Sequence, residues 1–226
     1  DKRKITFKNK IYYLKNNTKE EFIDKFLNKM TVKEEGGQIH IKDMFYLWKI
    51  YLKQERLPNM IYKAQFENKV RERIENVTSF FTGIKSNYLN NTKIVQKFWN
   101  QSINKDIDEE LEISELHTLI SKWAEDANID IIDFNEDTLK DIITHFYDDV
   151  TIENEKFLIG ISCNYWDKQA DMLEAFQHKF NKPIDKDITI YESYVMFCKY
   201  INNKDKILTV SKKYYYKYID KVIPEQ

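Results

Sequence analysis

Apolar residues recur along this chain in three sets that share one order. In each set, a pair of apolar residues four positions apart precedes an isoleucine, and an acidic residue follows that isoleucine two positions later. Large apolar or aromatic residues then stand seven and ten positions after the isoleucine. Residues three, four and seven positions apart share one face of a helix, so each set predicts amphipathic helices around a small core. The matching positions are Phe22/Phe26, Ile94/Phe98 and Met172/Phe176; Ile41, Ile113 and Ile190; Trp48, Ile120 and Phe197; and Tyr51, Trp123 and Tyr200.

A second internal match supports the same alignment. The segment GISCNYW at 160–166 repeats GIKSNYL at 83–89, with glycine, isoleucine, asparagine and tyrosine in the same order. Such repeats indicate a chain built from similar structural units. The shared place of Gly83 and Gly160 indicates either a backbone conformation that suits glycine or close packing that a side chain would disturb.

Between these anchors the sequence predicts helix, short strand, helix, helix and β-hairpin, in that order. Alternating apolar and polar residues predict short strands at 38–41, 111–113 and 187–190. We expect the isoleucine of each set to be buried in its strand and to pair with the hairpin where one exists. This order is the topology of a winged helix-turn-helix. The expected fold class is therefore mainly α with short β-hairpins, in about three tandem winged helix-turn-helix units (α-β-α-α-β-β).

The repeat also predicts where the units begin and end. We expect 17–89 and 90–166 to be complete winged-helix units, and 167–226 to be a third unit that lacks its hairpin. Residues 1–16 are expected to be the strand or wing of a preceding unit, as in a fragment of a longer protein. Because each unit is small, neighbouring units are expected to bury surface on one another.

Composition and charge narrow the classes of function. The chain is 42% hydrophobic with only four glycines and three prolines, as in a folded, helix-rich protein. Thirty-six basic residues against 37 acidic residues give a net charge of -1, so a nucleic-acid contact would need a local basic patch. Cys163 and Cys198 have no metal-type spacing, so we expect buried thiols. No run of about 18 apolar residues is present, and we expect a soluble, intracellular protein without a membrane partner.

Sequence motifs for catalysis are missing. There is no GxxxxGK[ST] phosphate loop and no glycine-bounded nucleophile. His145 with Asp148 and Asp149 has the spacing of a metal site, although an acidic turn after a helix is more often structural. We therefore expect no enzyme, no cofactor and no metal.

The third helix of each unit carries the candidate binding residues, since this helix enters the DNA groove in helix-turn-helix proteins. In the second unit it is acidic, with Lys140 among five carboxylates at 135–149, and a phosphate backbone would repel it. In the first and third units it is basic. The candidate nucleic-acid-binding residues are Lys63, Lys69, Arg71, Arg73, Lys212, Lys213, Lys217 and Lys221.

Other interpretations of these basic helices remain open. The lysines are equally consistent with an ordinary solvated surface. Tyr214 and Tyr218, which alternate with the lysines, stand where either packing against a neighbouring unit or stacking on bases is expected. We favour packing for both.

Part of the chain resembles a known family. Phe98 and Trp99, 112–116, Trp123, 145–147 and 161–168 are similar to sequence toward the C-terminal end of poxvirus-type helicase-primase proteins of giant nucleocytoplasmic DNA viruses, mimivirus-like in character. The resemblance covers the middle unit, and the flanking units through the repeat. It implies a winged-helix region beyond an ATPase core, in a viral protein of the host cytoplasm or viral factory. The family's catalytic motifs are absent here, so the resemblance implies an accessory region.

Two functions follow. The first is a non-catalytic nucleic-acid-binding region of a viral replication protein, which contacts the phosphate backbone of DNA or RNA through its basic third helices. The second is a protein-interaction scaffold of tandem winged helices that docks other viral replication subunits. The resemblance and the basic helices favour the first, whereas the near-neutral charge and the acidic middle unit favour the second.

Overall fold

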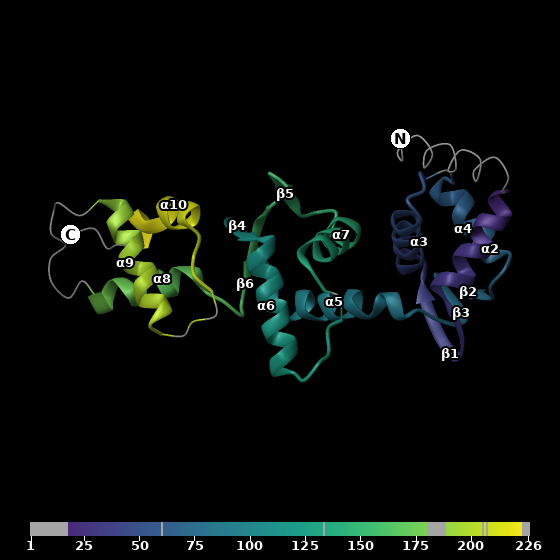
Figure 1. The fold of residues 1–226 in the computed structure, drawn as a ribbon, viewed down its shortest axis with the longest axis horizontal. Helices are drawn as coiled ribbons and strands as arrows, with labels where there is room; N and C mark the ends of the chain where they lie inside the picture. The colour runs from purple at the N-terminus through teal and green to yellow at the C-terminus, as the bar shows by residue number, and fades with distance from the viewer. Residues whose placement is uncertain are drawn as a thin grey trace, which may run out of the picture. The chain divides into compact units, whose positions relative to one another are not determined.

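The computed structural model describes residues 18–59, 61–132, 134–179, 189–204, 206 and 208–222. It is a mixed structure of helices and sheets, about 58% helical, with small antiparallel sheets of three strands (Figure 1). The chain divides into two compact units, Asp1–Ile94 and Val95–Gln226. The strand expected at 1–16 lies outside the described residues.

The described part of the first unit contains, in order, a helix, a long strand, two helices and two shorter strands. Helix α2 begins after Thr18 in a capping box with Glu21, as the sequence TKEE predicts. The sheet has the order β1-β3-β2 and is antiparallel. The elements are α2 (Lys19–Met30), β1 (Val32–His40), α3 (Ile41–Glu55), α4 (Lys63–Arg71), β2 (Asn76–Val77), β3 (Phe80–Lys85) and the short 3-10 helix η1 (Asn87–Leu89).

Aromatic side chains from three helices form the core of this unit. Phe26 of α2 meets Trp48, Tyr51 and Phe66 edge-on, with ring centroids 5.3, 5.7 and 5.5 Å away. All four are at most 2% exposed. Such edge-to-face pairs add to the stabilisation that burial alone provides, so the apolar positions of the repeat form the predicted core here.

The second unit repeats this element order and then adds three helices. Its sheet has the order β4-β6-β5, again antiparallel. Helix α5 contains the boundary between the two units. The elements are α5 (Asn90–Ser102), β4 (Ile103–Glu112), α6 (Ile113–Asp126), α7 (Glu136–Phe146), β5 (Thr151–Glu153), β6 (Phe157–Cys163), α8 (Lys168–Lys179), α9 (Ile190–Asn202) and α10 (Lys212–Val222).

The isoleucines of the repeat do not lie in strands, so that prediction is wrong. Ile41, Ile113 and Ile190 are instead the first residues of α3, α6 and α9. The acidic residue two positions later is the third helical residue, and in α6 and α9 its carboxylate accepts the backbone N–H of the residue before the helix, at 2.9 Å. Their burial also differs, because Ile113 is 4% exposed whereas Ile190 is 49% exposed. The pattern of isoleucine and acid is therefore a helix start.

Strands β1 and β4 are longer than the sequence predicted because each contains a large bulge. Lys33 pairs with Ile84 and Gln38 with Thr82, so residues 34–37 lie opposite one residue of β3. That residue is Gly83. In β4, residues 106–109 bulge in the same way opposite Gly160. The predicted third strand, 187–190, falls partly on residues outside the described part, and the rest of it is the start of α9.

The two glycines confirm that the match between 83–89 and 160–166 is structural. Gly83 has φ +75° and Gly160 has φ +80°. A Cβ built at either position meets nothing within 4 Å. Of the two reasons that the sequence left open, the backbone conformation is therefore the correct one, and close packing is not.

Helices α8, α9 and α10 belong to the same compact unit as the sheet β4-β6-β5. Their shared core includes Phe197, Tyr200 and Tyr215. The structure divides between Ile94 and Val95 into two compact units. The predicted division into three units therefore stays a prediction.

Candidate interaction site

The predicted binding residues Lys63, Lys69 and Arg71 lie on α4, and Arg73 follows two positions later. Lys69 forms an ion pair with Glu20 of α2, and Arg73 with Asp24 of the same helix. The side chains of Lys69 and Arg73 are only 21% and 20% exposed. The hydrogen bond from Lys69 also holds the pKa of Glu20 below its ordinary value. These two basic groups therefore hold α4 against α2.

Arg71 and Lys63 have partners within the same unit. Arg71 forms an ion pair with Glu67 at 2.9 Å and donates a hydrogen bond to the carbonyl of Thr78 in the turn between β2 and β3. Lys63 Nζ lies 5.6 Å from the centre of the Phe45 ring. All four predicted residues of the first unit thus contact groups of that unit.

The acidic third helix of the second unit, α7, is arranged differently. Lys140 forms an ion pair with Glu155 in the turn between β5 and β6, and Asp149, just after the helix, pairs with Lys105 at 2.6 Å. Glu136 and Asp137 at the start of α7 are exposed. Negative charge at a helix N-terminus is favourable, which accounts for these acids without a ligand.

Helix α10 carries the predicted residues of the third set, and two of its lysines meet one buried carboxylate. Lys213 and Lys217 lie 3.4 and 3.3 Å from the carboxylate of Glu110 on β4, whose side chain is 6% exposed. Lys213 also lies over the ring of Phe157, 3.8 Å from its centre. Lys212 instead lies over the rings of Tyr191 and Tyr216. The side chain of Lys221 lies outside the described residues.

The tyrosines that alternate with these lysines face the bulge of β4. Tyr214 is fully buried and donates to the carboxylate of Glu109, at 2.7 and 2.6 Å from its two oxygens. Tyr218, 1% exposed, donates to the backbone carbonyl of Asp108. Burial raises the pKa of Tyr214, and the hydrogen bond to Glu109 adds to the effect. Packing against a neighbouring part of the chain, rather than an open stacking surface, is therefore confirmed for both tyrosines.

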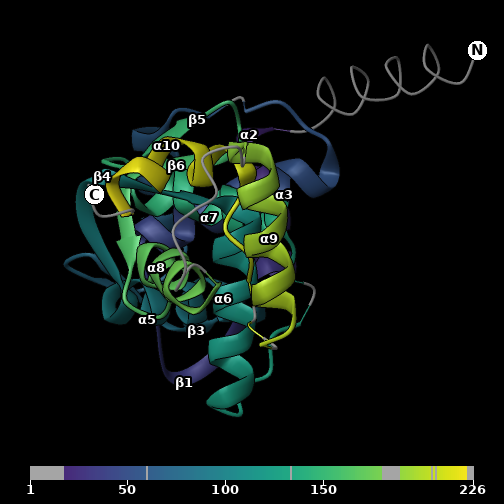
Figure 2. The ribbon, with the colours of Figure 1, turned by 90° about the vertical axis from the view of Figure 1, so that its left-hand side faces the viewer.

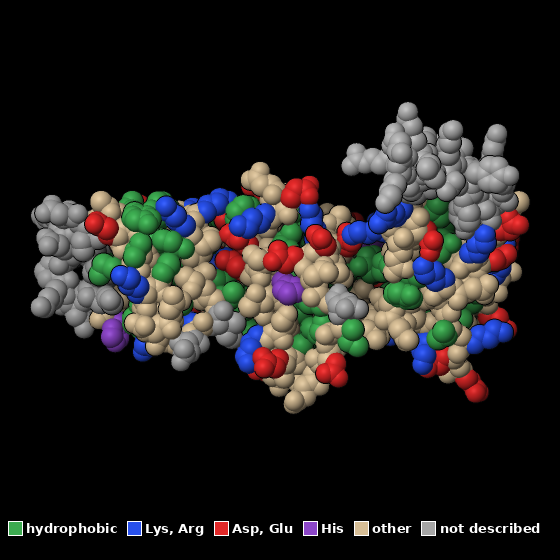
Figure 3. All heavy atoms as spheres, viewed as in Figure 1, with side chains coloured by type: hydrophobic (Ala, Val, Ile, Leu, Met, Phe, Trp, Pro, Cys, Tyr) green, Lys and Arg blue, Asp and Glu red, His purple; other side chains and the backbone are tan. Residues whose placement is uncertain are grey.

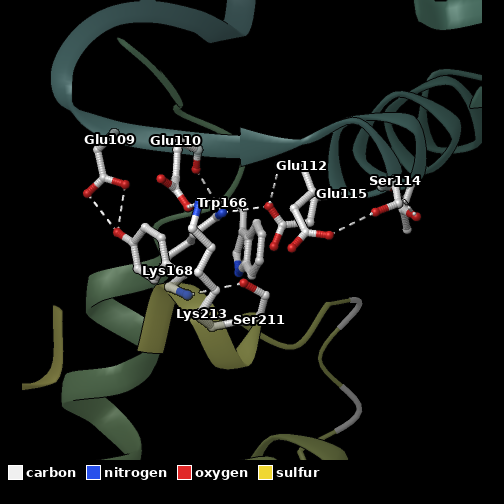
Figure 4. A network of polar contacts seen from close by, with 12 residues as sticks. Glu109, Glu110, Glu112, Ser114, Glu115, Trp166, Lys168, Ser211 and Lys213 are labelled. Carbon is white, nitrogen blue, oxygen red and sulfur yellow. Dashed lines mark hydrogen bonds and ion pairs between the residues drawn. The ribbon is translucent and has the colours of Figure 1, made fainter. Parts of the chain in front are cut away.

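A buried lysine joins the same strand to the start of α6 and of α8. Lys168 donates to the backbone carbonyl of Glu110 at 2.9 Å and to the carboxylate of Glu115 at 2.5 Å. Its Nζ lies 5.1 Å from the ring centre of Trp166 and 4.5 Å from that of Tyr214. Figure 4 shows Lys168 among Glu110, Glu115 and Trp166, with α10 beside them.

The ion pair between Lys168 and Glu115 is buried, and this burial affects the pKa of the carboxyl group. The side chains of Lys168 and Glu115 are 4% and 7% exposed. Burial raises the pKa of Glu115, although the nearby Lys168 acts in the opposite direction. One carboxylate oxygen of Glu115 is buried without a hydrogen-bond partner in the structure. A buried pair of this kind contributes little net stability relative to apolar side chains, but removing one partner alone is strongly destabilising.

The sequence did not predict Glu109, Glu110 or Lys168 as interaction residues. Glu109 and Glu110 lie in a polar run without strand alternation, and Lys168 stands two residues after the end of the repeated motif. The sequence pointed to Lys168 only by its position, eight residues after Gly160 and close to the end of the internal match.

A groove of about 420 Å³ lies beside the contacts that Lys168 makes with β4. Asp106, Glu109 and Asp167 line it together with Cys163, Trp166 and Lys168. Cys163 is a buried free thiol, as predicted, and burial raises its pKa, which makes it a poor nucleophile. Cys198 is only partly buried, so the prediction of a buried thiol is wrong for this residue.

Among the described residues, no group of three or more His, Cys, Asp and Glu side chains is arranged to hold a metal ion. Nor does any described helix have the length and apolar character needed to cross a bilayer.

The candidate site thus consists of contacts between a helix and a strand, made by ion pairs, aromatic rings and the hydroxyl groups of buried tyrosines. Its clearest example is the face of α10 against the bulge of β4, which lie side by side in both ribbon views (Figures 1 and 2). Comparison with protein-family models, with curated proteins and with solved structures found no match to this chain.

Proposed function

We propose that this chain is a non-catalytic protein-interaction module, built of tandem winged-helix units, in which the basic third helices α4 and α10 bind acidic protein surfaces. The observation that carries the proposal is the seating of α10 on β4. There a basic helix with buried tyrosines contacts Glu109 and the carbonyl of Asp108 in the bulge of β4, and Glu110 directly after the bulge. The chain thus uses a third helix for a contact between protein elements.

The partners of the basic residues support this proposal over phosphate binding. Each predicted binding residue whose side chain is described contacts an acidic group or an aromatic ring of its own unit. A phosphate would have to compete with these partners. Competition is easy for exposed pairs, which contribute about 0–1 kcal/mol. It is costly at Glu110, because removing its lysines would leave a buried carboxylate uncompensated.

The winged-helix organisation is part of the proposal. It is supported by the shared order of elements in 19–85 and 90–163, by the equivalent bulges of β1 and β4, and by three helices that begin at the repeated isoleucine. The resemblance to poxvirus-type helicase-primase proteins adds the expectation that the partners are subunits of a viral replication complex.

The experiment that separates this function from nucleic-acid binding is fluorescence anisotropy of the full chain with labelled single- and double-stranded oligonucleotides. Salt is varied over about 50–200 mM, where phosphate contacts change affinity by orders of magnitude. The proposal expects no saturable binding at the low end. Saturable binding that falls steeply with salt, and that Lys63→Glu with Lys69→Glu weakens more than Lys140→Glu does, would instead establish the nucleic-acid function.

A further inference from the structure

Helices α8, α9 and α10 have a hydrophobic core of their own. The buried residues that form it all lie within 172–219, and no described residue of α5–β6 belongs to it. The rings of Tyr214 and Tyr218 are part of this core, with their centres 4.3 Å apart. Their hydroxyl groups extend from it to Glu109 and to the backbone carbonyl of Asp108 on β4. The apolar core of the three helices therefore does not include the strand on which α10 lies.

The lysines that join α10 to β4 are accessible and not closely held. Lys213 and Lys217 lie 3.4 and 3.3 Å from the carboxylate of Glu110, whereas close hydrogen bonds between charged groups span about 2.7–2.9 Å. The side chains of the two lysines are 49% and 51% exposed. Figure 3 shows Lys and Arg side chains at the surface over α10 and β4. A carboxylate from outside the chain can therefore reach both lysines while Glu110 is still beside them.

The contact between α10 and β4 is also bordered by a groove. This groove of about 420 Å³ is lined by Asp106, Glu109 and Glu110 of β4 and by Lys168 and Gln169 of α8. Glu109 and Glu110, whose carboxylates hold α10, thus border the groove as well as the helix. A competing segment can therefore enter beside the strand before α10 has left it.

A buried ion pair holds the start of α8 in place. Lys168, the first residue of α8, pairs with Glu115 of α6, and their side chains are 4% and 7% exposed. Breaking a buried pair is costly because it leaves a charge uncompensated. Residues 164–167 join β6 to α8 beside this pair. The helix that can leave β4 is therefore α10, while the start of α8 stays on α6.

We propose that one face of α10 is an interaction surface, that the chain's own β4 bulge occupies it as an internal ligand, and that an acidic segment of a partner protein displaces the bulge. The α10 face consists of Lys213, Tyr214, Lys217 and Tyr218. This inference rests on the proposed function and deepens it by naming the chemistry of the partner. When the bulge is displaced, the three helices keep their core and turn about the link between β6 and α8.

The internal ligand specifies the partner. Residues 106–110 read Asp-Ile-Asp-Glu-Glu, and α10 contacts the last three of them. The partner therefore supplies two adjacent acidic side chains, one for Tyr214 and one for both lysines, and a free backbone carbonyl for Tyr218. A second copy of this chain is a poor candidate, because its own α10 already holds its bulge and an exchange between copies gains no contact.

The test uses fluorescence anisotropy with the full chain and two labelled peptides of sequence 103–112. One peptide has the natural sequence, and the other carries Glu109→Gln and Glu110→Gln. Each is titrated into the unchanged chain and into a chain with the same two substitutions, which weaken the internal ligand but keep the shape of its side chains. Because a ligand within the chain competes at an effective concentration of about millimolar, we expect the natural peptide to bind the substituted chain at least about tenfold more tightly. The glutamine peptide should show no such preference.

Lysine variants locate the binding surface. Added to the substituted chain, Lys213→Gln with Lys217→Gln should lower the affinity for the natural peptide at least about tenfold, as expected when hydrogen bonds between charged groups are lost. Because Glu110 is already replaced in this chain, removing the lysines leaves no buried carboxylate unpaired there. The matched control is Lys199→Gln with Lys204→Gln, at two exposed positions in α9 and just after it, which should leave the affinity unchanged.

The inference would be overturned by absence of binding to the substituted chain, by equal affinity of the natural peptide for the two chains, by equal affinity of the two peptides, or by equal losses from the two pairs of lysine variants. Dimers of the unchanged chain in light scattering would make a second copy the occupant instead. Oligonucleotide binding would overturn the proposed function whatever the peptides do. Absence of peptide binding overturns this inference alone, because the peptides probe α10 and not α4.

Discussion

Two glycines carry the most specific residue-level information in this sequence. Gly83 and Gly160 were matched by sequence alone, and both prove to have positive φ opposite a bulge in the neighbouring strand. A side chain at such a φ is strained because its Cβ crowds the backbone. The sequence matched the two glycines but left backbone conformation and close packing both open as the reason for them. The bulge opposite each glycine could not be predicted, since residues 106–109 carry no alternating pattern.

Replacing Gly160 by alanine should destabilise the second unit by about 1–2 kcal/mol, the usual cost of the left-handed conformation for a residue with a Cβ. Gly160→Asn should cost less, because asparagine enters this region more readily. Urea unfolding followed by tryptophan fluorescence measures both. A cost for asparagine equal to or greater than that for alanine would show that side-chain volume matters instead, contrary to the open space around this position.

At the scale of elements, the sequence predicted helices better than strands. The positions of the repeat that were expected to be apolar helix faces, among them Trp48, Ile120 and Phe197, are buried on α3, α6 and α9. Strands β1 and β4 begin several residues earlier than predicted, because their first halves are polar and their pairing depends on β3 and β6. The acids after Ile113 and Ile190 cap the starts of α6 and α9, whereas α3 is capped by the side chain of His40.

The ion pair between Lys168 and Glu115 joins the start of α8 to the start of α6. It could not be predicted from local patterns because the two residues lie 53 positions apart in the chain. Lys168→Met should leave a buried carboxylate without its partner and destabilise the second unit by about 3–5 kcal/mol. The double variant Lys168→Met with Glu115→Leu should recover most of that loss, since a buried pair can be replaced by apolar side chains at little cost.

Lys122→Met is the matched control for this cycle, because Lys122 pairs with the exposed residues Glu125 and Asp126. It should cost no more than about 1 kcal/mol. The measurement is chemical denaturation of five proteins: the unchanged chain, Lys168→Met, Glu115→Leu, the double variant and Lys122→Met. Simple addition of the two single costs in the double variant would mean that Lys168 and Glu115 do not interact as the structure shows.

For the whole molecule, the balance of acidic and basic residues indicated the partners of the lysines better than the local clusters of lysine did. With 36 basic and 37 acidic residues, a basic stretch on one helix has acids available on its neighbours. The sequence located the basic helices correctly but could not identify their partners, because Asp24 and Glu110 are remote in sequence from Arg73 and Lys217. The order of helices and strands was predictable from local patterns. The ion pairs of the basic residues, which bear on the choice between binding functions, could be identified only from the three-dimensional structure.

The most direct test of the central claim is a charge exchange across the contact between α10 and β4, followed by thermal unfolding of the full chain. Lys213→Glu with Lys217→Glu would place two carboxylates beside the buried Glu110, and should destabilise the unit by about 1–3 kcal/mol, as expected when a buried group loses its partners. Adding Glu110→Lys should restore most of the lost stability. Unchanged stability in the double variant, with no effect of Glu110→Lys upon it, would contradict the account and return these lysines to the role of a free binding surface.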